Sequence, residues 1–158
     1  TGATALGQSL GDAASLTALH IRGNRIGAFG AGALGLALSR LVQLESLRMG
    51  RNGIGESGVL AMCDNGLTNL QCLRHFECGH NGLGLAGTRR LPPTLLKLTT
   101  IESLDLCGNG CGPQGLESLL TAFHAMTKLC DLRLWGNDLH HEGVRVLRLE
   151  RPSLAIYL

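Results

Sequence analysis

The residues that could bind a metal ion are concentrated in one short segment. Two cysteines and two histidines fall within nine residues, at Cys72, His75, Cys78 and His80. Thiolate sulfur and imidazole nitrogen are ligands that tetrahedral zinc prefers. Zinc binding is therefore the first chemistry to consider, and it requires that the local structure can point these side chains at one centre.

A second motif with chemical meaning is Gly30-Ala-Gly32-Ala-Leu-Gly35, which matches the G-x-G-x-x-G fingerprint of dinucleotide binding. That fingerprint must directly follow a strand. Here a turn around Asn24 separates the glycines from the apolar alternation that ends near Ile21. We therefore expect close helix packing through small residues, and no cofactor.

Residues that would support enzymatic catalysis are missing from the sequence. No nucleophile is paired with a base and an orienting group, and no two carboxylates have clearly separated environments. The polar segment 140–142 (His-His-Glu) is interpreted as a turn before Gly143. We expect a protein that is not an enzyme.

The composition describes one soluble, folded domain of 158 residues. Hydrophobic residues make up 44% and charged residues 16%, and no apolar run reaches the roughly 18 residues of a membrane span. The net charge of +2 gives no sign of nucleic acid or membrane as a partner. Six cysteines in an aliphatic-rich chain favour reduced thiols and a cytoplasmic location.

A repeated asparagine indicates the helices and strands that must position the residues discussed above. Apolar residues stand eight, five and three positions before it and two positions after it, and a glycine follows six positions after it. The pattern is L-x-x-L-x-L-x-x-N-x-L-x-x-x-G. It occurs five times, 28 or 29 residues apart, at Asn24, Asn52, Asn81, Asn109 and Asn137.

This pattern resembles the leucine-rich repeat family, in its ribonuclease-inhibitor-like class. The resemblance implies an α/β fold, a right-handed horseshoe-shaped solenoid with a parallel sheet on the concave face and helices on the convex face. The residue pattern supports these strands and helices independently of the resemblance. Leu104-Asp-Leu106 alternates as a half-buried strand does, and 115–123 has helical spacing. We expect the asparagine side chain to bond backbone groups where the chain leaves each strand.

The whole chain, 1–158, is predicted to be a single domain of stacked repeats. Because 1–15 matches only the helical part of a repeat and neither end has a polar cover, we expect this domain to be part of a longer array. The predicted units are a partial repeat 1–15, full repeats 16–43, 44–72, 73–100, 101–128 and 129–152, and a C-terminal segment 153–158.

Two proline-containing sites predict departures from the regular repeat. Pro92-Pro93 should break the convex helix of its repeat and restart it as a short helix with proline in the first turn. Pro152 should end the helix that begins near Gly143, before an apolar segment that could add one atypical strand.

The predicted strands argue against the zinc site. Cys78 takes a buried leucine position, and His75, an odd number of residues away, points to the opposite face. We therefore expect no metal. Cys111 also replaces a repeat leucine, and Cys107 on the concave face is the one thiol we expect to be reactive.

Side chains between the repeat leucines face the concave side. The middle column reads His20, Arg48, Glu77, Asp105, Arg133, and the next column reads Arg22, Gly50, Gly79, Cys107, Trp135. Arg48 could pair with Glu77 and Asp105 with Arg133, so these charges either satisfy one another or bind a partner. Trp135 beside Arg133 is typical of an interface hot spot, with an edge-covering role as the alternative. The candidate partner-binding residues are Trp135, Arg133, Asp105, Glu77, Arg48 and His75.

We expect a non-enzymatic protein-protein interaction module or scaffold built from about five to six leucine-rich repeats. It should be a subunit or fragment of a larger multi-protein complex, with cytoskeletal and axonemal assemblies among the candidates. Its partners should be proteins. Two alternatives stay open: a leucine-rich repeat regulator that activates a small GTPase, and the sensing region of a nucleotide-binding innate-immunity receptor. They differ from the scaffold in what lies outside these repeats.

Overall fold

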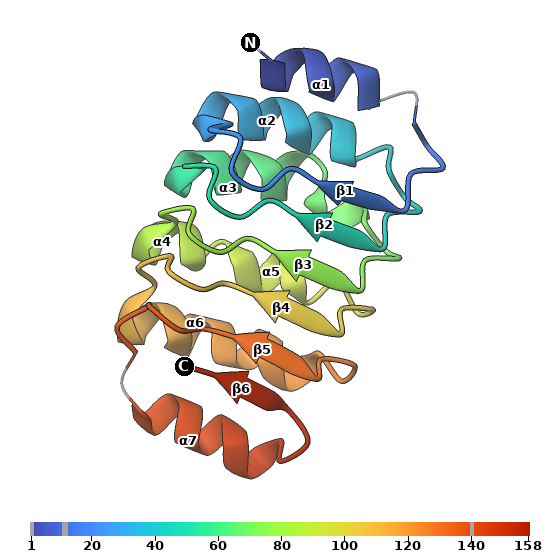
Figure 1. Cartoon of the computed structure of the whole chain (residues 1–158). Coiled ribbons are helices and arrows are strands. Elements are labelled where there is room, and N and C mark those ends of the chain that lie inside the picture. Colours follow the sequence, from blue (N-terminus) through green and yellow to red (C-terminus); the bar gives the residue numbers. More distant parts are fainter. Residues whose placement is uncertain (1, 11–12, 140) are drawn as a thin grey trace.

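Each repeat folds as a three-residue strand followed by a helical segment, in the computed structural model of the chain (Figure 1). The structure describes residues 2–10, 13–139 and 141–158. Of the polar turn expected at 140–142, position 140 lies outside these ranges, and the turn is wrong for positions 141 and 142, which are the first two residues of a helix. The elements are α1 (Gly2–Leu10), β1 (Ala18–His20), α2 (Gly27–Leu38), β2 (Ser46–Arg48), α3 (Gly55–Asn65), the 3₁₀ helix η1 (Leu67–Asn69), β3 (His75–Glu77), α4 (Gly84–Thr88), α5 (Leu91–Leu95), β4 (Ser103–Asp105), α6 (Gly112–Ala125), β5 (Asp131–Arg133), α7 (His141–Glu150) and β6 (Ala155–Tyr157).

The six strands form one parallel sheet in sequence order, and the helices lie together along one face of that sheet (Figure 1). Parallel strands lie about 4.8 Å apart, whereas packed helices need about 8–10 Å between their axes. The layer of strands is therefore shorter than the layer of helices, and the solenoid curves so that the sheet is on the concave face. The predicted α/β solenoid is confirmed. The central residue of each strand is buried, in register with its neighbours: Leu19, Leu47, Phe76, Leu104, Leu132 and Ile156.

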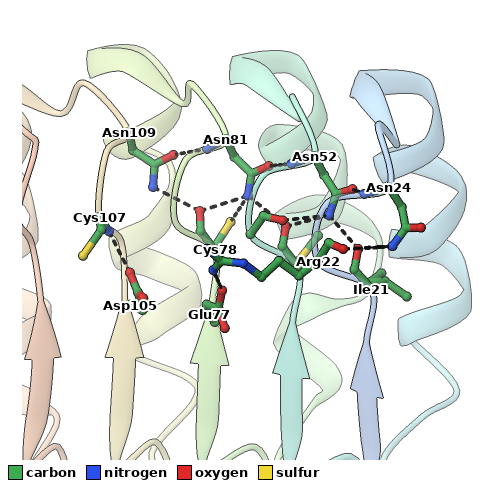
Figure 2. A network of polar contacts seen from close by, with 12 residues as sticks. Ile21, Arg22, Asn24, Asn52, Glu77, Cys78, Asn81, Asp105, Cys107 and Asn109 are labelled. Atoms are coloured by element: carbon green, nitrogen blue, oxygen red, sulfur yellow. Dashed lines mark hydrogen bonds and ion pairs between the residues drawn. The ribbon is translucent and has the colours of Figure 1, made fainter.

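The repeat asparagines form a continuous ladder where the strands end (Figure 2). The Oδ1 of Asn81 accepts the backbone N–H of Asn52 at 2.9 Å, and its Nδ2 donates to the carbonyls of Met49 and Cys78 at 3.0 and 2.9 Å. The same contacts recur at Asn52, Asn109 and Asn137. The expected bonding to backbone groups is confirmed, and it also links each repeat to the one before.

The turn around each asparagine explains much of the glycine content. In the four repeats from Asn24 to Asn109, the positions one before, one after and three after it adopt a left-handed backbone, as at Arg51, Gly53 and Gly55 with φ of 56°, 62° and 66°. A side chain makes that conformation costly, so glycine occupies most of these positions. The turn leads the chain from the sheet directly into the convex helix.

Small residues allow the convex helices to pack closely. A Cβ added to Gly58 of α3 would lie 3.0 Å from the Cα of Ala28 in α2, and one added to Gly35 would lie 3.0 Å from the Cα of Met62. Gly30 and Gly35 lie inside α2 rather than at its start. The G-x-G-x-x-G sequence is therefore helix packing, as expected. Every helix in the described ranges is too short or too polar to span a bilayer.

The proline pair interrupts the convex layer as predicted. Residues 84–95 form two five-residue helices, α4 and α5, in place of one long helix (Figure 1). Pro92 and Pro93 lie in the first turn of α5, where their missing N–H groups cost no intrahelical bond. The sheet above them continues without a change of register.

The C-terminal segment extends the solenoid. β6 pairs with β5 in parallel, which confirms the expected atypical strand after Pro152. Arg151 binds the C-terminal end of α6, because its guanidinium donates to the carbonyls of Phe123, Met126 and Leu129 at 2.6–2.8 Å. The Phe123 carbonyl belongs to the last turn of α6, and those of Met126 and Leu129 to the turn that follows it, so the arginine links the helix end to the last repeat.

The ladder predicts a large stability difference between two equivalent asparagines. Asn81→Ala leaves the buried N–H of Asn52 without its acceptor, at about 1–3 kcal/mol, and removes one of the two amide donors from the carbonyls of Met49 and Cys78, so we expect a loss of about 3 kcal/mol. Asn24→Ala is the matched control. Asn24 is exposed, its Oδ1 accepts no N–H within the described ranges, and the Ile21 carbonyl that it bonds keeps the Asn52 amide as a donor, so we expect a loss below about 1 kcal/mol. Urea denaturation measures both, and equal losses would contradict the ladder.

Candidate functional site

A hollow with a volume of 430 Å³ lies on the concave face of the sheet, across β2 to β5. It contains five of the six candidate residues, Trp135 being the exception. Its charged side chains come from the middle column of the sheet and from the positions that flank it. The lining residues are Arg48, His75, Phe76, Glu77, Glu102, Ser103, Asp105, Cys130, Asp131 and Arg133.

The predicted columns are in register, but the predicted ion pairs are wrong. Arg48 is the neighbour of Glu77, and Asp105 is the neighbour of Arg133. Glu77 instead pairs with Arg22, two strands away, as Figure 2 shows. Arg133 pairs with Asp131 on its own strand, with Nε 3.0 Å from Oδ1. Within the described ranges, Arg48 makes no ion pair.

Gly50 explains the long reach of Arg22. It follows β2, between the positions of Arg22 and Gly79, and a Cβ there would lie 2.8 Å from Oε1 of Glu77 and 3.2 Å from Nη1 of Arg22. The absence of a side chain opens a path across β2. Because Glu77 is paired with Arg22, the neighbouring Arg48 guanidinium in the hollow is left without this carboxylate as a partner.

Cys107 is not the reactive thiol that we expected. Only 1% of it is exposed, and burial, together with the hydrogen bond and charge of Asp105, raises the pKa of its thiol to about 12. The Asp105 carboxylate also accepts the Cys107 backbone N–H at 2.9 Å. Because the thiolate is the nucleophile, a neutral buried thiol is inert.

Two of the four residues that suggested zinc, Cys78 and His75, lie on opposite faces of the sheet. Cys78 points into the core, where burial raises the pKa of its thiol to about 12 and the Asn81 amide contacts its sulfur at 3.4 Å. His75 is exposed on the concave face. The strand alternation that argued against a shared ion is therefore observed.

Trp135 lies on the concave side just beyond β5 and is 45% exposed. Its ring contacts the imidazole of His80 edge-on, with centroids 4.9 Å apart. Nε2 of that imidazole is buried without a hydrogen-bond partner in the described part of the chain. Arg133, which we expected to accompany Trp135, stacks instead over Tyr157 at 5.8 Å.

Sequence reasoning missed three residues of this surface: Tyr157, Asp131 and His80. Tyr157 is half-exposed and continues the middle column, opposite Arg133. The alternation of Ala155-Ile156-Tyr157 could have indicated it, since the segment was already expected to be a strand. Asp131 could have been found as the first residue of β5, whereas nothing in the sequence indicated that His80 would reach Trp135.

The thiols predict a selective chemical modification. With iodoacetamide at pH 8, we expect Cys130, which is exposed, to be alkylated first and Cys72, which is partly buried, next. Cys78 and Cys107 should resist until the protein unfolds, because their raised pKa keeps them protonated at that pH and burial blocks access. Peptide mass spectrometry measures the rates. Alkylation of Cys107 as fast as Cys130 would contradict the described packing.

Comparison with known proteins agrees with the geometry. A family model described as "Leucine Rich repeat" matches residues 13–35 and 43–63. The chain is 34% identical to ribonuclease inhibitor of Sus scrofa over 141 residues and 29% identical to ribonuclease inhibitor of Mus musculus over 143 residues. Each match covers 84% of this chain and 29% of the relative, so the chain spans less than a third of the curated relatives' length.

These similarities concern the same features that the structure shows. The repeat period, the asparagine ladder and the parallel sheet backed by helices recur through the described ranges. The chain is a leucine-rich repeat protein of the ribonuclease-inhibitor-like class.

Proposed function

We propose that this chain is a non-enzymatic module that binds a protein partner on its concave sheet. The leucine-rich repeat is a non-catalytic binding fold, and two similar proteins are named as inhibitors of an enzyme. The observation that carries the proposal is the 430 Å³ hollow, in which Arg48, Glu77, Asp105 and Arg133 stand in adjacent strands.

The charges in this hollow give the proposal its chemistry. Arg48 makes no ion pair within the described ranges, and the Asp105 carboxylate bonds only Cys107 there, at its backbone N–H and its thiol. The hydrogen-bonded strands hold both side chains at fixed spacing before a partner arrives. Pre-organisation of this kind lowers the entropy cost of binding. The matching partner presents an acidic group to Arg48 and a basic group to Asp105.

Trp135 adds an apolar contact beyond the charged hollow. Tryptophan and arginine are over-represented among residues that dominate interface affinity. Its ring contacts His80, and 45% of the residue is exposed, so a partner can bury that exposed part without rearranging the sheet. We assign Trp135 the largest single contribution, followed by Arg133.

We further propose that the module belongs to a longer array within a multi-protein, cytoplasmic complex. At the β1 edge, a hollow of 540 Å³ is lined in part by Leu6, Ile21 and Ile26. Oδ1 of Asn24 accepts no hydrogen bond within the described ranges, whereas Oδ1 of Asn52 accepts the N–H of the preceding asparagine. Both features fit another repeat stacked on β1.

Site-specific photo-crosslinking tests which face binds the partner. A benzophenone amino acid replaces Asp105 in the hollow or, as the matched control, Glu56 on the convex helix α3. A purified ribonuclease is the first probe, because the relatives' names point to it. Crosslinking from position 105 alone supports the concave site. Crosslinking from position 56 alone would contradict it.

Affinity measurements on the partner identified in that way test the contributions. We expect Trp135→Ala to weaken binding about 30-fold, the 2 kcal/mol or so of a hot spot, and Arg133→Ala to weaken it less. Melting temperatures of both variants serve as the control for folding. Unchanged affinity of Trp135→Ala, or a loss that unfolding fully explains, would refute the assignment.

A further inference from the structure

The convex face has a basic pocket at the helix break, on the opposite side of the molecule from the concave hollow. Its volume is 210 Å³. The walls come from the end of α3, from η1, and from the α4–α5 segment. The lining residues are Cys63, Asp64, Thr68, Arg89, Arg90, Pro93, Thr94 and Lys97.

The break at Pro92-Pro93 is what places two arginines at this pocket. Arg89 and Arg90 form the corner between α4 and α5 and are exposed. The equivalent positions of the neighbouring repeats, 60–61 and 117–118, lie inside the continuous helices α3 and α6. The basic corner is therefore specific to this repeat and is not required by the repeat fold.

The pocket is strongly basic for its size. Arg89, Arg90 and Lys97 carry three positive charges against the one carboxylate of Asp64, which leaves +2, as much as the net charge of the whole chain. Asp64 lies 3.8 Å from Nη2 of Arg90, too far for a hydrogen bond. Burial raises the pKa of the Cys63 thiol, so that group stays neutral.

Two cations of this pocket are unused. Within the described ranges, the guanidinium of Arg89 and the ammonium of Lys97 have no ion pair and no hydrogen bond, whereas Arg74 binds Glu102 through two 3.0 Å bonds. Thr68 adds a hydroxyl to the lining, and the buried Thr94 side chain bonds the Cys63 thiol. Clustered unpaired cations repel one another, and an anion removes that repulsion.

We propose that this pocket binds a phosphoryl group. A phosphoryl oxyanion has three or more strong acceptors, and guanidinium groups bind them through paired N–H donors. The pocket has room for such a group with bound water. Its two sources are a free phosphate ion and a phosphorylated side chain of another protein, and both present the same chemistry. The site is independent of the concave surface.

An NMR titration of the ¹⁵N-labelled protein with sodium phosphate at pH 7.5 tests the proposal, with sodium chloride of equal ionic strength as the reference. We expect saturable shifts at amides in residues 63–68 and 89–97 that chloride does not reproduce. Arg89→Gln and Lys97→Gln should each weaken binding about tenfold, the loss of one charge-assisted contact.

Arg40→Gln is the matched control, because Arg40 is an exposed convex-side arginine outside the pocket lining. It should leave the phosphate affinity unchanged. Identical shifts with chloride, or undiminished affinity in the Arg89→Gln/Lys97→Gln double variant, would overturn the proposal. Titration with O-phosphoserine separates the sources: tighter binding than phosphate supports a phosphorylated side chain, and weaker binding supports the free ion.

Discussion

The carboxamide of each repeat asparagine is the interaction on which the other features of this fold depend. From Asn52 onward, it accepts the N–H of the preceding asparagine and donates to carbonyls of its own and the preceding repeat. These groups are buried where the chain leaves the sheet, and water cannot replace the side chain there. The ladder therefore sets the spacing of the strands and, through the turn, the start of each convex helix.

The regular part of the fold could be predicted because its causes are local in the sequence. The period placed every strand, and alternation within each strand separated Phe76 and Cys78 from His75. Proline chemistry predicted the break at Pro92-Pro93. Each of these inferences needs only a residue, its neighbours and a known backbone preference.

The contacts on the concave face could not be predicted in the same way, because they depend on side-chain length and on empty space between strands. Register alone made Arg48 the partner of Glu77, but Gly50 lets Arg22 reach the same carboxylate. Cys107 belongs to an outward-facing column and is nevertheless buried beside Asp105. The basic pocket arises from the one repeat that departs from the pattern, so an average repeat could not reveal it.

Amide hydrogen exchange at the repeat asparagines tests the ladder most directly. The N–H groups of Asn52, Asn81 and Asn109 each donate to the next asparagine, whereas that of Asn137 has no acceptor in the described ranges. NMR-detected exchange should therefore be much slower at the first three than at Asn137, although all four residues are buried. Equal exchange at all four, or slowest exchange at Asn137, would contradict the claim that this ladder holds the repeats together.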